Sequence, residues 1–185
     1  MKMEKTKVGS TSVWDMTFKR IFFGWVWLSI SLLSPADVLP VDFIRDTLGA
    51  VPPERRLVLE AEEQSVAAAM LGTRRFKSTV SYWQKNGQRI WVLQARGKVN
   101  LIDAGLVVEQ GRVVKGEVLV FRESRGHQIC SDRFLKQLKG LFFKKNGKLN
   151  RKVDGYSGAT YSVNAVRKMA RLALYLDSLA QPAKE

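Results

Sequence analysis

Two short turn signals, each lying between apolar segments, constrain the fold of this chain most strongly. Asn86-Gly87 is a favoured sequence for the two-residue turn of a β-hairpin, and Gln110-Gly111 offers a second hairpin turn. The strands expected on either side of these turns comprise residues 76–83, 90–93, 101–108 and 113–121. The sequence therefore predicts an antiparallel sheet built of hairpins.

Helical patterns precede and follow these strands. Residues 41–48 and 61–71 each end before a glycine, the residue that most readily adopts a helix-ending left-handed conformation. Further helices are expected at residues 131–140 and about 163–179. The last of these collects apolar residues on one face, namely Val166, Met169, Ala170, Ala173 and Leu176, which predicts packing on the sheet. The expected class is α+β, one domain with helices packed on an antiparallel sheet of hairpins, after an N-terminal signal segment.

Residues 1–36 are predicted to be a targeting segment. Lys19 and Arg20 precede an apolar run over residues 21–33, which as a helix would span about 20 Å, short of the ~30 Å hydrocarbon core. The small residues of Ser34-Pro35-Ala36 then favour a signal peptide cleaved after Ala36. The alternative is an uncleaved anchor that thins the bilayer. In both cases the basic flank stays in the cytoplasm, and residues 37–185 form the domain outside it.

The chain has one cysteine, Cys130, and one histidine, His127. Two ligands are too few for a structural zinc site, and no second histidine supports a catalytic pair. The sequence therefore predicts neither a metal site nor a cysteine nucleophile.

Basic residues exceed acidic ones, with a formal net charge of +14, and the run from Arg133 to Lys152 contains no acidic residue. Such a run can bind nucleic acid, anionic lipid or an acidic protein. The expected export argues against nucleic acid. The aromatics within the run stand among leucines, which predicts core contacts instead of stacking platforms for bases: Phe134, Phe142 and Phe143. A solvated face near the membrane and a docking surface for an acidic redox partner remain as alternatives.

The segment from Asp154 to Thr160 reads Asp-Gly-Tyr-Ser-Gly-Ala-Thr and precedes the last helix. Gly158 and Ala159 leave little side chain between two hydroxyls, so another molecule's phosphate can approach closely. Ser162 is expected to be the N-cap of the last helix. The free N–H groups and the positive end of that helix would then favour an anion held at Thr160.

This motif, an Asp followed after a short gap by Ser/Thr-Gly-Ala-Thr, resembles the FMN-binding domain family. The best-known members are the periplasmic flavin subunits of the Rnf and sodium-pumping NADH:quinone reductase complexes. The resemblance runs from about residue 97 to 166, including a turn, strand and Glu-containing loop at residues 111–126 and a following helix that carries Phe134, Gln137 and Gly140. One departure concerns the loop, where many members have Thr-Pro-Gly after the glutamate and this chain has Ser124-Arg125-Gly126. The attachment motif is unaffected by this departure, and no role of these three residues against the flavin ring is carried over from the family.

In that family a flavin transferase takes FMN from FAD and esterifies its phosphate to the threonine that follows the alanine. The resemblance therefore implies covalent FMN on Thr160. The cofactor-binding residues that it implies are Asp154, Ser157, Gly158, Ala159, Thr160 and Glu123. Tyr156 and Tyr161 are further candidates for contact with the flavin ring, although ordinary packing explains both equally well. No catalytic residue and no metal ligand is implied.

The function expected from the resemblance is an exported electron-transfer flavoprotein in the periplasm or on the outer face of the cytoplasmic membrane. Its partners would be a flavin transferase and membrane or periplasmic redox proteins. Because the chain lacks a Gly-x-Gly-x-x-Gly element for NAD(P)H, an electron carrier is favoured over a stand-alone oxidoreductase. Two alternatives remain, a non-redox sensing or scaffold module of the same fold and a small periplasmic flavin-dependent reductase.

Overall fold

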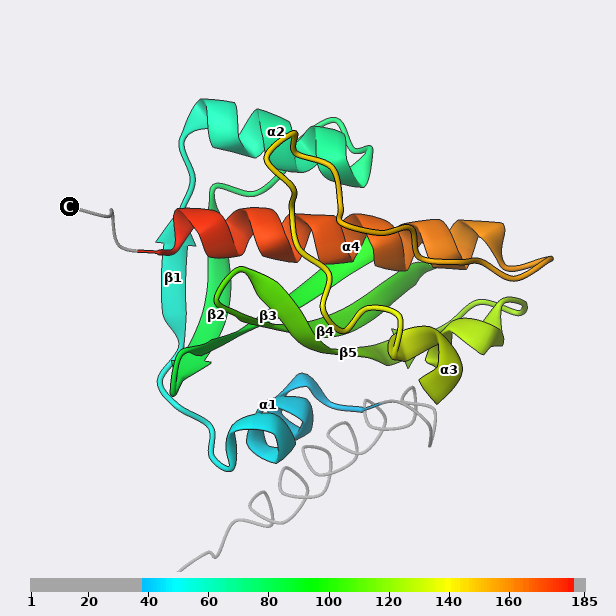
Figure 1. The fold of residues 1–185 in the computed structure, drawn as a ribbon, viewed down its shortest axis with the longest axis horizontal. Helices are drawn as coiled ribbons and strands as arrows, with labels where there is room; N and C mark the ends of the chain where they lie inside the picture. The colour runs from blue at the N-terminus through cyan, green and yellow to red at the C-terminus, as the bar shows by residue number, and fades with distance from the viewer. Residues whose placement is uncertain (1–37, 182–185) are drawn as a thin grey trace, which may run out of the picture. The chain divides into compact units, whose positions relative to one another are not determined.

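The computed structural model describes residues 38–181, and these form a five-stranded antiparallel sheet with helices on both faces (Figure 1). The strands lie in the sheet in the order in which they occur in the sequence: β1 (Arg55–Val58), β2 (Thr79–Lys85), β3 (Gln88–Arg96), β4 (Leu101–Glu109) and β5 (Arg112–Phe121). This arrangement confirms the predicted α+β class. The predicted targeting segment lies outside the described residues. No helix between residues 38 and 181 is long and apolar enough to span a bilayer.

Both predicted hairpin turns are present. Asn86 and Gly87 have φ angles of 51° and 81°, and the flanking residues Lys85 and Gln88 pair across the hairpin. Gln110 and Gly111 have φ angles of 50° and 71°. Two successive positive φ angles define the turn that matches the right-handed twist of the strands. Strand β1 was not predicted, because it is an exposed edge strand without apolar alternation.

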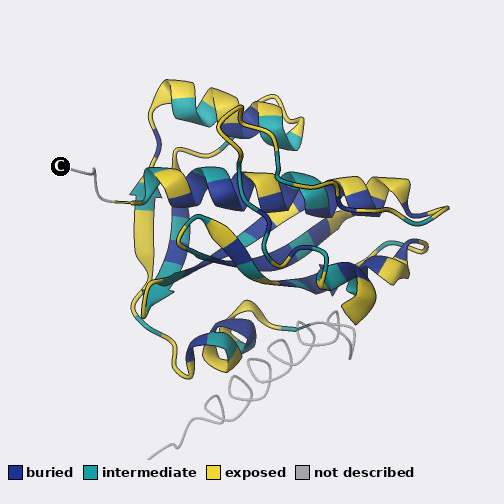
Figure 2. Ribbon diagram, viewed as in Figure 1, coloured by how far each residue is buried: buried dark blue, intermediate teal, exposed yellow. Residues whose placement is uncertain are grey.

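Helices cover the two faces of the sheet separately (Figure 1). Helices α2 (Ala61–Leu71) and α4 (Thr160–Leu179) lie over one face, and α1 (Pro40–Leu48) packs on the other. In β4, Ala104 and Leu106 belong to the core under α4, whereas Val107 belongs to the core under α1. Two covered faces explain why this strand is almost continuously apolar. Figure 2 shows the matching pattern on α4, with buried positions alternating with exposed ones along the helix.

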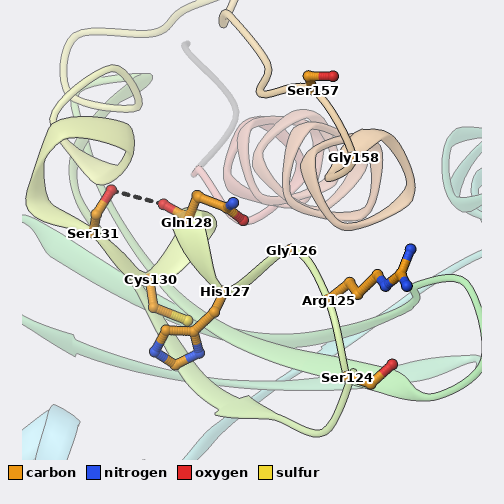
Figure 3. Close-up of a pocket in the computed structure, with 9 residues that line it drawn as sticks. All are labelled: Ser124, Arg125, Gly126, His127, Gln128, Cys130, Ser131, Ser157 and Gly158. Carbon is orange, nitrogen blue, oxygen red and sulfur yellow. Dashed lines mark hydrogen bonds between the residues drawn. The ribbon is translucent and has the colours of Figure 1, made fainter.

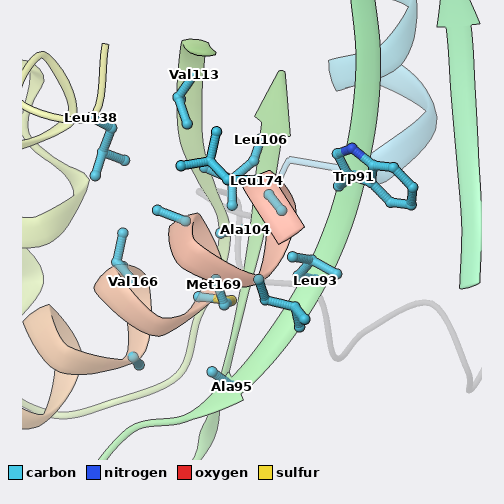
Figure 4. Packing of buried hydrophobic residues seen from close by; sticks show 14 of the residues in the cluster. Trp91, Leu93, Ala95, Ala104, Leu106, Val113, Leu138, Val166, Met169 and Leu174 are labelled. Carbon is cyan, nitrogen blue, oxygen red and sulfur yellow. The ribbon is translucent and has the colours of Figure 1, made fainter. Parts of the chain in front are cut away.

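The larger core joins the sheet to α4 as the amphipathic pattern predicted. Met169 and Leu174 of α4 lie with Leu93, Ala104 and Leu106 of the sheet (Figure 4). Met169 and Leu106 are completely buried. This packing fixes the position of α4, and therefore of the residues at its N-terminus.

The predicted helix over residues 131–140 is wrong in extent. The chain forms a short 3-10 helix, η1 (His127–Cys130), and one α-helical turn, α3 (Asp132–Leu135), followed by turns that end at Gly140 with a φ of 82°. A tertiary contact explains the early end. The Gly140 N–H donates to the Val113 carbonyl at 2.6 Å, and the Val113 N–H donates to the Leu141 carbonyl at 2.9 Å. These bonds draw the chain onto the edge of β5 and out of the helical path.

Residues 142–150 form a small hairpin, here called the lysine hairpin. Phe143 and Leu149 pair as an isolated bridge, and the tip between them exposes three lysines, Lys144, Lys145 and Lys148. Phe134 is buried as predicted, whereas Phe142 and Phe143 are only partly buried. The guanidinium of Arg112 lies 4.0 Å from the centre of the Phe142 ring. The basic run is therefore divided between α3 with the turns after it, the lysine hairpin, and the residues that directly follow the hairpin.

Candidate functional site

Helix α4 begins at Thr160, earlier than predicted. Its N-cap is Ala159, whose carbonyl accepts the Val163 N–H at 2.9 Å. The prediction of Ser162 as N-cap is therefore wrong: Ser162 lies inside the first turn and is only 3% exposed. Its side chain packs against the loop at Gly126. The position of Ser162 is therefore set by its packing against the loop and not by a capping hydrogen bond.

Thr160 is the first residue of α4 and is exposed. The first N–H groups of an α-helix have no acceptor within the helix. The structure shows no side-chain cap and no acidic residue in the first turn of α4. A phosphate held at the Thr160 hydroxyl would therefore meet unpaired N–H donors and the positive end of a 20-residue helix.

The turn that leads into Thr160 packs against the rest of the domain on one side and is exposed to solvent on the other. The Asp154 N–H donates to Gln137 Oε1 at 2.7 Å, and the Tyr156 ring packs against Phe134 with centroids 6.2 Å apart. Ser157 and Gly158 are exposed. Gly158 has a φ of +79°, and no atom lies within 4 Å of the place where a Cβ would stand. The positive φ therefore favours glycine at position 158. The empty space around its Cβ position leaves room for another molecule.

A pocket of about 660 Å³ lies beside this turn (Figure 3). Ser157 and Gly158 form one side of it, and the opposite side comes from the loop after β5 and from η1. The residues from that second side are Ser124, Arg125, Gly126, His127, Gln128, Cys130 and Ser131. The structure thus places the loop beside Ser157 and Gly158 of the motif, whereas Asp154, Ala159 and Thr160 do not line the pocket. No sequence pattern indicated Gln128 or Ser131.

Glu123, another predicted site residue, is bound to the turn between β3 and β4. Its Oε1 accepts the N–H groups of Val99 and Asn100 at 2.8 and 2.9 Å. Partial burial acts to raise the pKa of Glu123, but these hydrogen bonds outweigh it and hold that pKa below its ordinary value of 4.5. Glu123 is not among the residues that line the pocket. In the structure it supports the turn between β3 and β4.

Cys130 and His127 both line the pocket (Figure 3). Burial raises the pKa of the Cys130 thiol to about 11, so the thiol stays protonated and weakly nucleophilic at neutral pH. His127 packs edge-on against Phe121 with ring centroids 5.5 Å apart. Within residues 38–181, no cluster of three or more His, Cys, Asp or Glu side chains is placed to hold a metal ion. These two residues therefore contribute packing and shape to the pocket.

Gly126 packs closely against the first turn of α4. It has a φ of +93°, and a Cβ there would stand 2.6 Å from Ser162 Oγ. We expect Gly126→Ala to lower the free energy of unfolding by about 1–3 kcal/mol, because the added Cβ would collide with the buried Ser162 side chain and alanine is strained at this φ. Chemical denaturation measures this change.

Gly147→Ala is the matched control for Gly126→Ala. Gly147 also has a positive φ, +73°, but nothing lies within 4 Å of its Cβ position. Its alanine variant therefore carries backbone strain without a collision. Equal destabilisation of the two variants would contradict the close packing of the loop on α4.

Comparisons with known proteins match the segment that contains the site and the fold of the domain. Residues 97–175 match the model of the FMN-binding domain, a stretch that contains the pocket and the motif. The fold is similar to that of NqrC from Shewanella oneidensis in its crystal structure, with a TM-score of 0.53 and 13% sequence identity. That alignment covers 75% of this chain and 88% of NqrC. None of the curated proteins matches the chain significantly in sequence.

Proposed function

Because residues 97–175 match the FMN-binding domain, we propose that this chain is an electron-transfer flavoprotein that carries FMN on Thr160 through a phosphoester. The observation that carries the proposal is the placement of the Thr160 hydroxyl: exposed, at the N-terminus of α4, after a turn whose Ser157 and Gly158 line the pocket. Unpaired N–H donors suit the phosphate, and the pocket of about 660 Å³ offers space for the flavin ring.

Attachment is proposed to use FAD and a separate flavin transferase. A bond forms between Thr160 Oγ1 and the phosphorus of the FMN half of FAD. The bond from that phosphorus to the bridging oxygen of the pyrophosphate breaks, and AMP leaves with the hydroxyl proton. Thr160 contributes the accepting oxygen, and the small residues Gly158 and Ala159 leave the approach open. The chain itself needs no nucleophile of lowered pKa, because the transferase supplies the catalysis.

The flavin, when bound, would supply the redox chemistry, and the protein its position and electrostatic surroundings. A covalent link keeps the cofactor present where free FMN is scarce, without a deep binding pocket. We further propose that residues 1–36 direct export and that the electron partners are redox proteins of the membrane or periplasm. The proposal about the electron partners rests on the resemblance to flavin subunits of membrane redox complexes.

Co-expression of the full chain with a flavin transferase tests the proposal. The intact mass should rise by one FMN less one water, and the gel band should fluoresce after denaturation in SDS. The same spectrum shows whether residues 1–36 have been removed, and cell fractionation shows where the labelled protein resides. Unmodified, colourless protein would favour the scaffold alternative. Turnover of a substrate by the flavinylated protein without any protein partner would favour the reductase alternative.

A further inference from the structure

A second cavity, of about 670 Å³, is lined by residues distinct from those of the pocket beside the motif. Four separate segments form it: the C-terminal end of α2, the end of β3, residues 149–153 and α4. Six of its lining residues are cationic, and none is acidic: Arg96, Arg151, Lys152, Arg167, Lys168 and Arg171. We call it the basic cavity.

None of these six side chains forms an ion pair within the described residues. The ion pairs that residues 38–181 do form lie elsewhere, for example between Lys115 and Glu117 on β5. Like charges that converge on a concave surface raise its positive potential and repel one another. An anion in the cavity would reduce this repulsion.

Three of the six side chains are held in place by hydrogen bonds to backbone carbonyls. Lys168 Nζ donates to the Leu71 carbonyl at 2.9 Å. Arg151 Nη2 donates to the carbonyls of Gln137 and Lys139, and Arg167 Nη2 donates to that of Val153. Arg167 Nε is buried and has no acceptor within the described residues. Positioned donors lose less conformational entropy when a ligand arrives, which favours binding.

The other three cations, Arg96, Lys152 and Arg171, are exposed and form no side-chain hydrogen bond with the described residues. Guanidinium groups match phosphate oxygens in pairs of parallel hydrogen bonds. The cavity also presents less polar surface, including the Tyr161 ring, which is 60% exposed. Its volume is in the range of small-molecule sites. A ligand with several phosphate charges and a planar part would meet both kinds of surface.

We propose that the basic cavity binds a small ligand carrying two or more linked phosphate groups, such as a nucleoside diphosphate. An anionic membrane surface fits less well, because the six cations line a concave cavity of about 670 Å³ that a bilayer surface cannot enter.

Calorimetric titration of the full-length protein tests the proposal, with inorganic pyrophosphate and ADP as probes in about 0.15 M salt. Saturable binding of both is expected, and none of adenosine. The variant Arg96→Gln/Lys152→Gln/Arg171→Gln keeps the three carbonyl-bound cations, so its fold should persist. It should bind pyrophosphate at least about tenfold more weakly, because three charge-assisted contacts are lost.

Lys144→Gln/Lys145→Gln/Lys148→Gln is the matched control, since it removes the same charge from the tip of the lysine hairpin, outside the cavity lining. Its affinity should change less than about twofold at this salt concentration. Equal weakening in the two triple variants, or no saturable binding of pyrophosphate, would overturn the proposal. So would binding to phosphatidylglycerol vesicles that needs the cavity residues while pyrophosphate fails to compete. Thr160→Ala should bind pyrophosphate normally, which separates this site from flavin attachment.

Discussion

Replacing Thr160 by alanine is expected to abolish covalent flavin completely while leaving the fold intact. The proposed linkage uses the Thr160 hydroxyl, and alanine provides no oxygen to accept the phosphate. The side chain is exposed at the first position of α4 and makes no hydrogen bond to another described residue. Surface substitutions of this kind change the free energy of unfolding by about 0.5 kcal/mol or less. Intact mass and fluorescence in SDS gels, after co-expression with a flavin transferase, measure the loss.

Two variants show that the loss belongs to this hydroxyl. Thr160→Ser keeps an oxygen at the same position and should retain labelling, whereas Ser157→Ala removes the neighbouring hydroxyl and should leave labelling at Thr160. Thermal unfolding of all three variants excludes a folding defect. A fluorescent band that persists in Thr160→Ala would place the linkage on another residue and contradict the proposal.

The sheet and its turns were predictable because their signals are local. Asn86-Gly87 defines a hairpin within two residues, and the amphipathic pattern of α4 is complete within a single segment. The same holds for the motif at residues 154–160, where small residues and hydroxyls are consecutive. Local patterns therefore identified the sheet and its main helix, whereas the role of the motif in attachment stays a prediction.

Features that depend on tertiary contacts were predicted wrongly or missed. Helix α3 ends early because Gly140 and Leu141 bond to β5, and α4 starts early because Ser162 packs under Gly126. The assignment of Glu123 to the cofactor stays a prediction, but the contact of its carboxylate with the turn after β3 was missed. The basic cavity draws on residues from 71 to 171, so no single stretch of sequence shows it.

A buried ion pair between α4 and the sheet was also invisible in the sequence, since its members are 88 positions apart. Arg89 Nη1 of β3 lies 3.0 Å from Asp177 Oδ1, and the two side chains are 10% and 0% exposed. Asp177 Oδ2 accepts a further hydrogen bond from Gln181 Nε2 at 3.2 Å. This pair ties the C-terminal end of α4 to β3, at the opposite end of the helix from Thr160.

Asp177→Ala is expected to lower the free energy of unfolding by about 3–5 kcal/mol, because it leaves the Arg89 guanidinium buried without its counter-charge. Arg89 Nε already lacks an acceptor within the described residues, so no second partner compensates. The melting temperature should fall by roughly 10 °C. Denaturation in urea and thermal unfolding measure both changes.

Asp42→Ala is the matched control, since it breaks an ion pair of similar length, 2.7 Å to Arg45, that is about half exposed on both sides. Exposed pairs contribute about 0–1 kcal/mol, so this variant should remain close to the wild type. Arg89→Met/Asp177→Leu, which removes both charges, should recover much of the stability lost in Asp177→Ala. If Asp177→Ala is no less stable than Asp42→Ala, the pair does not anchor α4. Below its melting temperature Asp177→Ala should still accept flavin on Thr160, because the proposed attachment site lies at the other end of the helix.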